Sequence, residues 1–104
     1  MSGIFGIIRY DGASVDRADL NRIAAPLAKI APDGTRLWQE GAAGLGQCVM
    51  RTEVEDVYDT QPIHDGALTL VSSARIDNRE ALAAELVIDA DTLARTADSA
   101  LIMA

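Results

Sequence analysis

The sequence predicts one small α+β domain, and three stretches of the chain carry this prediction. Met1–Ile8 is an apolar run rich in β-branched isoleucine, which favours a buried inner strand. Two further strand-like segments are joined through Gly41. Between these stretches, apolar residues recur at helical spacing, at Leu20, Ile23, Leu27 and Ile30. With 104 residues, 49% of them hydrophobic, the chain has the size and composition of one modest globular domain.

The first helix is expected to begin at a cap provided by Ser14 or Asp16 and to run to about Ile30. Pro26 lies inside this pattern. It removes one backbone donor and leaves the Arg22 carbonyl unpaired, at a cost of about 3 kcal/mol in a regular helix interior. We therefore expect a kink or an early end near Pro26.

A turn at residues 32–34 is expected to lead from this helix into a hairpin. In Pro32-Asp33-Gly34 the proline presets φ and the glycine accepts a positive φ. Thr35–Glu40 and Ala43–Met50 are the predicted strands, and the second is rich in small residues, as a close-packed strand would be.

The second half of the chain predicts shorter elements. Residues 51–61 are acidic and show little periodicity, which indicates a solvated surface loop that contains Glu53, Glu55, Asp56 and Asp59. A strand is expected at Ala67–Val71. Asp77 or Asn78 then caps a helix through Leu86, with Glu80 placed to complete a capping box. A last helix begins near Asp98.

Composition restricts the classes of function. A net charge of −7 and a pI near 4.4 oppose binding to a phosphate backbone, so nucleic acid is not an expected partner. No apolar run has the roughly 20 residues that a membrane span needs, and we expect a cytoplasmic protein. A single cysteine, Cys48, and a single histidine, His64, predict no zinc site. Cys48 is expected as a small buried hydrophobe and His64 in a turn, while spacing alone leaves a Cys–His catalytic pair open.

The start of the chain offers one reactive arrangement. Ser2 becomes the terminal residue if Met1 is removed. A free α-amine has a pKa of about 7.7 to 8 and can take a proton from the neighbouring hydroxyl, as in terminal-threonine enzymes. Ser2 is therefore either an N-terminal nucleophile or simply a small residue after the initiator methionine.

The order of the landmarks resembles the N-terminal glutaminase domain of asparagine synthetases, a class II glutamine amidotransferase. The family opens with Met-Cys-Gly-Ile-x-Gly, which Met1–Gly6 resembles. Four other family motifs, Arg-Gly-Pro-Asp-Gly, Leu-Gly-His, Gln-Pro and Asn-Gly-Glu-Ile-Tyr-Asn, resemble Ile30–Gly34, Leu45–Gln47, Gln61-Pro62 and Ser73–Asn78. The family's Ser-Asp-Ser-Glu resembles Ala97–Ala100. The resemblance implies an N-terminal-nucleophile hydrolase-like αββα sandwich, with residues 1–104 as its N-terminal portion and the synthetase domain outside them.

The residues that differ from the family pattern are those that the resemblance places in catalysis and substrate binding. The resemblance places Ser2 at the position of the cysteine nucleophile and Val49 at the arginine that pairs with the substrate carboxylate. Ser73 and Ala74 take the positions of the Asn-Gly oxyanion donors, whereas Asp98 is retained where the substrate ammonium would bind. Loss of one oxyanion donor costs ~100-fold or more in rate, so the resemblance predicts a catalytically degenerate domain.

Two segments look closest to asparagine-synthetase-like cyclases of lasso-peptide pathways: Ser2–Gly6 and Ala74–Arg79. This resemblance implies a scaffold or interface for an ATP-dependent amide-forming synthetase domain or subunit, with ATP and magnesium bound there, no cofactor in this chain, and a peptide as substrate. Two alternatives stay open: an active glutaminase that uses Ser2, and a small acidic α/β binding module. Because the predicted helices are too few to cover the apolar strands, we also expect self-association.

Overall fold

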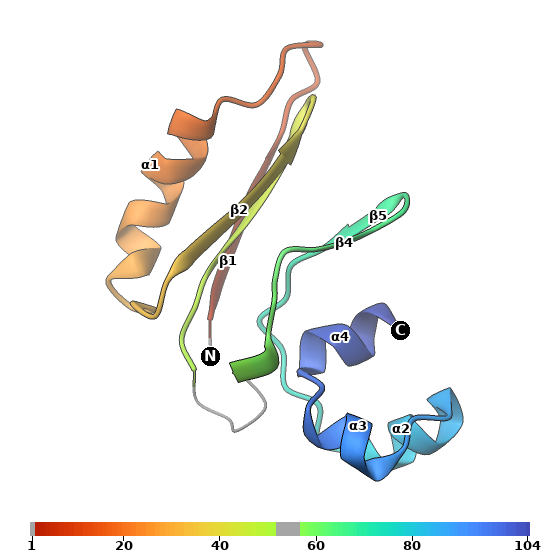
Figure 1. The fold of residues 1–104 in the computed structure, drawn as a ribbon. Coiled ribbons are helices and arrows are strands. Elements are labelled where there is room, and N and C mark those ends of the chain that lie inside the picture. Colours follow the sequence, from red (N-terminus) through yellow and green to blue (C-terminus); the bar gives the residue numbers. More distant parts are fainter. Residues whose placement is uncertain (1, 52–56) are drawn as a thin grey trace.

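The computed structural model describes residues 2–51 and 57–104 of the chain. It is a mixed α+β structure, as the sequence predicts, with a helix-covered sheet at one end and a helical group at the other (Figure 1). In chain order the elements are β1 (Gly3–Ile8), α1 (Arg17–Ala28), β2 (Thr35–Glu40), β3 (Ala43–Cys48), β4 (Ile63–Asp65), β5 (Leu68–Leu70), α2 (Arg79–Leu86), α3 (Ala90–Ala94) and α4 (Asp98–Met103). Two antiparallel sheets result, in the orders β1–β3–β2 and β4–β5.

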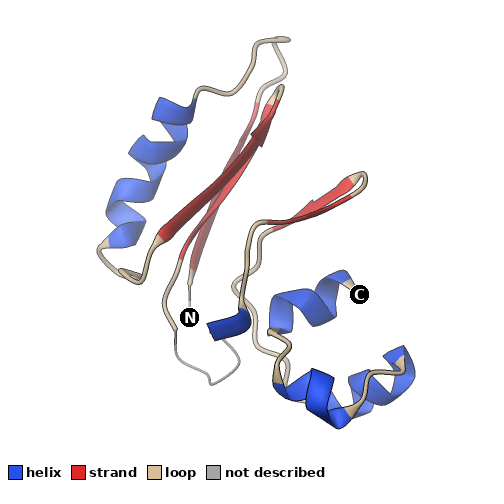
Figure 2. Cartoon of the chain, in the orientation of Figure 1, coloured by secondary structure: helices blue, strands red, loops and turns tan. Residues whose placement is uncertain are grey.

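The larger sheet buries one face against α1 (Figure 2). Cys48 at the end of β3 packs with Ala24 and Ala31, and Phe5 lies against this cluster. The Phe5 ring covers Gly46, where an added Cβ would lie 2.1 Å from a ring carbon. The small residues of β3 are therefore required by close packing, which agrees with the prediction for this strand. Cys48 is fully buried, also as expected.

The prediction that the first strand is a buried inner strand is wrong. Among the described strands, β1 pairs only with β3 and lies at the sheet edge. Its residues alternate in exposure, because successive side chains of a strand point to opposite faces. Phe5 faces α1, whereas Ile4 and Ile8 lie on the open face of the sheet and are 44% and 61% exposed.

The first helix follows its predicted start and ends early. The Asp16 carboxylate accepts a hydrogen bond from the Ala18 backbone N–H at 2.9 Å, as an N-cap should. The helix stops at Ala28, two residues after Pro26, which confirms the expected early end. The predicted apolar stripe is only partly right. Leu20 is fully buried, but Ile30 lies beyond the helix and is 73% exposed.

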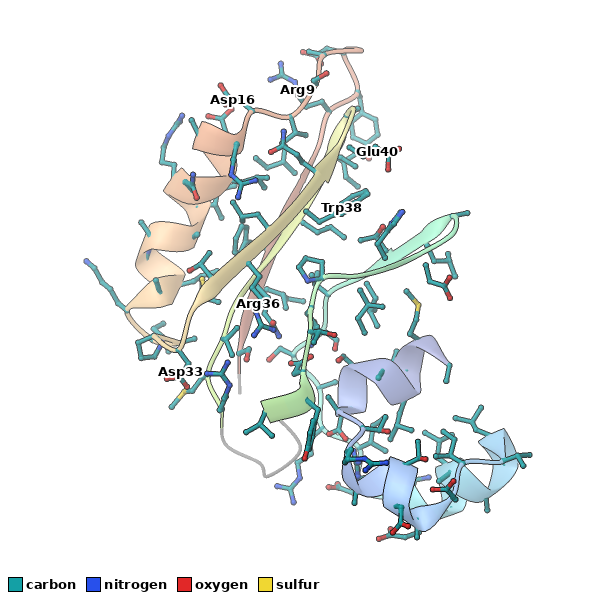
Figure 3. All side chains as sticks on the ribbon, viewed as in Figure 1. Arg9, Asp16, Asp33, Arg36, Trp38 and Glu40 are labelled. Carbon is teal, nitrogen blue, oxygen red and sulfur yellow. The ribbon has the colours of Figure 1, made fainter. Side chains whose placement is uncertain are left out.

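Both hairpins turn at glycines in the left-handed region. The β2–β3 hairpin is confirmed, with Gly41 at φ 55°. The β4–β5 hairpin turns at Gly66, with φ 60°, and its first strand falls where the sequence predicted only a turn. The His64 ring in β4 stacks on the Trp38 ring in β2, with centroids 5.4 Å apart, so the hairpin touches the open face of the larger sheet at Trp38. Trp38 is labelled in Figure 3.

The helical group differs from the prediction in its details. Helix α2 starts after Asn78 as expected, but Asn78 makes no side-chain cap bond, so the predicted capping box is wrong. Helix α3 was not predicted; Asp89 caps it by accepting from the Thr92 backbone N–H at 2.7 Å. Helix α4 begins at Asp98, as predicted. The described residues thus form four α-helices, one more than the three that the sequence predicts.

The molecule is flat and elongated, with extents of 44 × 31 × 16 Å and a radius of gyration of 14.9 Å. A compact chain of this length would have a radius of gyration of about 13 Å. Residues 52–56, and with them Glu53, Glu55 and Asp56 of the predicted acidic loop, lie outside the described residues. None of the helices that the structure describes is both long enough and apolar enough to span a bilayer.

Candidate functional site

A cluster of buried polar side chains surrounds Asp59, which the sequence predicted to be a solvated loop residue. The Asp59 carboxylate is partly buried and accepts hydrogen bonds from Gln47 Nε2 at 3.3 Å, Gln61 Nε2 at 3.1 Å and Ser99 Oγ at 2.7 Å. These three donors are 0%, 4% and 3% exposed. The main-chain oxygen of Asp59 accepts from Arg36 Nη1 at 2.5 Å. We call Gln47, Asp59, Gln61 and Ser99 the Asp59 cluster.

The cluster joins three separate parts of the fold. Gln47 comes from the central strand β3 and Ser99 from the first turn of α4. Gln61 precedes β4, and its Oε1 accepts from the Ser72 backbone N–H just after β5. The bonds therefore hold the hairpin and α4 against the larger sheet. Because only the amide nitrogen of Gln47 can face a carboxylate, its Oε1 points away and receives no donor from any described residue.

Ser2, which the resemblance places at the nucleophile position, is half-buried beside the end of β3. Its Oγ accepts a hydrogen bond from the Met50 backbone N–H at 3.0 Å. This bond ties the start of β1 to the chain that leaves β3. The hydroxyl is thus used in joining two backbone segments.

Val49, which the resemblance places at the carboxylate-binding arginine, is 2% exposed. Its N–H donates to the Gly34 carbonyl at 2.7 Å, and its carbonyl accepts from the Asp33 N–H at 2.8 Å. An apolar side chain buried in this way offers a carboxylate neither charge nor donors.

Ser73 and Ala74, which the resemblance places at the oxyanion positions, are exposed in the segment between β5 and α2. The residue before them, Ser72, is the one whose N–H is bound by Gln61. The Asp59 cluster therefore fixes the point from which this segment departs.

Asp98, which the resemblance places where a substrate ammonium would bind, is paired with protein groups. Its carboxylate forms an ion pair with the Arg79 guanidinium and accepts from the Ile76 N–H at 2.9 Å. Both ionic side chains are largely buried, at 15% and 17% exposure. Arg79 also donates to the main-chain oxygens of Leu93 at 2.9 Å and Thr96 at 2.6 Å, so it links the start of α2 to the end of α3 and the start of α4.

Three of the predicted site positions lie next to residues that the Asp59 cluster fixes. Val49 comes two residues after Gln47, Ser73 follows Ser72, whose N–H is bound by Gln61, and Asp98 precedes Ser99. No local pattern marked Asp59, because its partners come from distant parts of the chain. The Gln61-Pro62 match was the only signal near it.

Cys48 and His64 do not form a catalytic pair. Cys48 faces α1, where its Sγ lies 3.6 Å from the Ala24 carbonyl oxygen. His64 lies on the opposite side of the sheet, stacked on Trp38 and with Nδ1 2.8 Å from Thr69 Oγ1. In residues 2–51 and 57–104, no three or more His, Cys, Asp or Glu side chains converge in a way that could hold a metal ion.

Comparison with known proteins gives one match. The model of a family described as glutamine amidotransferase domain covers residues 1–104. No curated protein and no solved structure matches the chain.

Proposed function

The chain belongs to the glutamine amidotransferase domain family, and from this premise we propose that it is a catalytically degenerate member that does not hydrolyse glutamine. Its role is that of a scaffold or interface for an amide-forming synthetase of the asparagine synthetase type. The alternative of an unrelated acidic binding module gives no account of a family match over every residue.

The observation that carries this proposal is that the Asp98 carboxylate is ion-paired with Arg79 and bound by the Ile76 N–H. A carboxylate that binds a substrate ammonium must be free to accept that charge. Here Arg79 neutralises Asp98 and the Ile76 N–H occupies another of its acceptor positions. A substrate ammonium would have to compete with the Arg79 guanidinium for a largely buried carboxylate whose charge is already neutralised.

The other site positions support the same conclusion. Val49 has no group that could bind the substrate carboxylate, and its side chain is buried. The Ser73 side chain is a hydroxyl and not the amide donor that the resemblance implies at this position. The Ser2 hydroxyl is a weaker nucleophile than a thiol at neutral pH and is tied to the Met50 N–H.

The finer resemblance suggests the reaction in which the partner takes part. The residue sequences of Ser2–Gly6 and Ala74–Arg79 resemble those of lasso-peptide cyclases and so support a synthetase of that type. Such an enzyme activates a carboxylate with ATP and forms an amide bond that closes a ring. ATP and magnesium then bind to the synthetase, and a peptide is the substrate. The cytoplasm is the proposed location.

Ammonia release from L-glutamine tests the catalytic half of the proposal. The purified chain, with Met1 removal verified by intact mass, should release no more ammonia than its Ser2→Ala variant. Ser2→Cys is the informative companion, since it restores a thiol at the nucleophile position and leaves Val49 and Asp98 unchanged. It should also be inactive. Turnover that depends on Ser2, or a gain in Ser2→Cys, would mean that the chain is a working glutaminase.

A separate observation tests the scaffold half. A pyrophosphate loop of the form Ser-Gly-Gly-x-Asp-Ser, encoded in the same gene or its neighbour, would supply the synthetase. If no such loop is encoded nearby, the scaffold role loses its partner, whatever the result of the ammonia assay.

A further inference from the structure

We propose that two copies of this chain associate edge to edge through β1, related by a two-fold axis at Gly6. This inference is independent of the proposed function. The Asp59 cluster holds the hairpin and α4 on the open face of the sheet, but among the described strands β3 is the only neighbour of β1. One edge of β1 therefore offers backbone groups that another strand can pair with.

The ladder with β3 determines which backbone groups these are. The Arg9 N–H donates to the Ala42 carbonyl at 2.8 Å, directly beyond the registered pair Ile8 and Ala43. In an antiparallel pair, bonded and non-bonded residue pairs alternate. Phe5 and Ile7 therefore bond to β3, and the N–H and C=O groups of Ile4, Gly6 and Ile8 point to the free edge.

These outward groups are complementary to themselves. If β1 meets a second β1 in antiparallel fashion with Gly6 opposite Gly6, then Ile4 lies opposite Ile8 of the other copy. Every outward donor then finds an acceptor. A register shifted by two residues leaves either Ile8 or Ile4 without a partner among these outward groups, depending on the direction of the shift. A shift by one residue puts opposed side chains on different faces. The favoured register is thus unique, and it is isologous, as two-fold interfaces are.

Side chains and charge favour the same pairing. Ile4 and Ile8 are 44% and 61% exposed, and they become cross-strand neighbours on the open face. Residues 3–8 include no charged residue and no proline, which are the features that usually protect an edge strand. The other edge strand, β2, carries Arg36 and Glu40. In a chain of net charge −7, the edge of β1 allows two copies to approach without opposing like charges.

Sedimentation over a range of concentrations, combined with amide hydrogen exchange, tests the association and its location. We expect a monomer–dimer equilibrium in which the Ile4, Gly6 and Ile8 amides become protected as concentration rises. The Phe5 and Ile7 amides, already bonded to β3, serve as the internal reference. A chain that stays monomeric overturns the proposal, and so does a dimer in which the Ile4, Gly6 and Ile8 amides exchange as fast as in the monomer.

A pair of double variants tests the register. Ile4→Lys with Ile8→Lys places like charges opposite each other twice in the dimer and should raise its dissociation constant by about tenfold or more. Ile4→Lys with Ile8→Glu removes the same two apolar side chains but opposes unlike charges, and it should dimerise more tightly than the first variant. The difference should shrink at high salt. Unchanged Phe5 and Ile7 protection verifies that both variants fold, and equal dissociation constants for the two would contradict the register.

Discussion

Replacing Arg79 with alanine removes a guanidinium that is 15% exposed and that joins three helices. The change leaves Asp98 without its ionic partner and the Leu93 and Thr96 carbonyls without the Arg79 donor. Breaking a buried pair by removing one partner costs roughly 3–5 kcal/mol. We place the loss at the lower end, about 3 kcal/mol, because Asp98 keeps the Ile76 N–H.

Urea unfolding followed by circular dichroism measures this loss. With a slope of about 1–3 kcal/mol per molar urea, the midpoint should fall by roughly 1–3 M. Arg75→Ala is the matched control. It removes the same charge four residues away, where the pair with Asp77 is 71% and 86% exposed and contributes about 0–1 kcal/mol. If the two variants had equal midpoints, the Arg79–Asp98 pair would not hold the helical group together, and the argument against ammonium binding at Asp98 would fail.

Three further predictions concern single side chains. Asp59→Asn should lower stability by about 1–3 kcal/mol in thermal unfolding, because an amide cannot accept from all three donors of the cluster, whereas Asp91→Asn, at an exposed site, should change little. The Arg9 guanidinium lowers the pKa of Asp11 from 3.8 to about 2, so its stabilising effect is complete above pH 3.8 and is lost as the pH falls toward 2. Asp11→Asn should therefore lower the melting temperature at neutral pH and have no effect below pH about 2; the same effect at both would contradict this. The fully buried Cys48 thiol should react with Ellman's reagent only when urea unfolds the chain, and rapid labelling of the native chain would show that the α1 face opens.

The elements that could be predicted are those with a local signal. Helix α1 has its cap at Asp16, its breaker at Pro26 and an apolar period between them. The β2–β3 hairpin has its glycine turn. The short β4 and α3 were missed because three and five residues carry too little periodicity. The edge position of β1 could not be read from its composition, because it depends on how many strands pair with it.

The candidate site could be predicted only as a set of positions. The resemblance gave Ser2, Val49, Ser73, Ala74 and Asp98, but no local pattern gives the partners of these residues. Arg79 and Asp98 are 19 residues apart in the sequence, and Asp59 and Ser99 are 40 apart. Such contacts form only when the hairpin and the helical group pack against the sheet. For this reason the sequence predicted Asp59 only as a loop residue, although it lies at the centre of the cluster. It also gave no sign that Asp98 is ion-paired with Arg79.

The retention of Asp98 is explained by structure without reference to a substrate. It lies in the first turn of α4, where a carboxylate interacts favourably with the free N–H groups of the helix start. It accepts from the Ile76 N–H and so fixes the segment that leads into α2. It also forms an ion pair with the largely buried Arg79 guanidinium. A carboxylate with these three functions is needed by the fold whether or not glutamine ever binds, so its presence is no sign of activity.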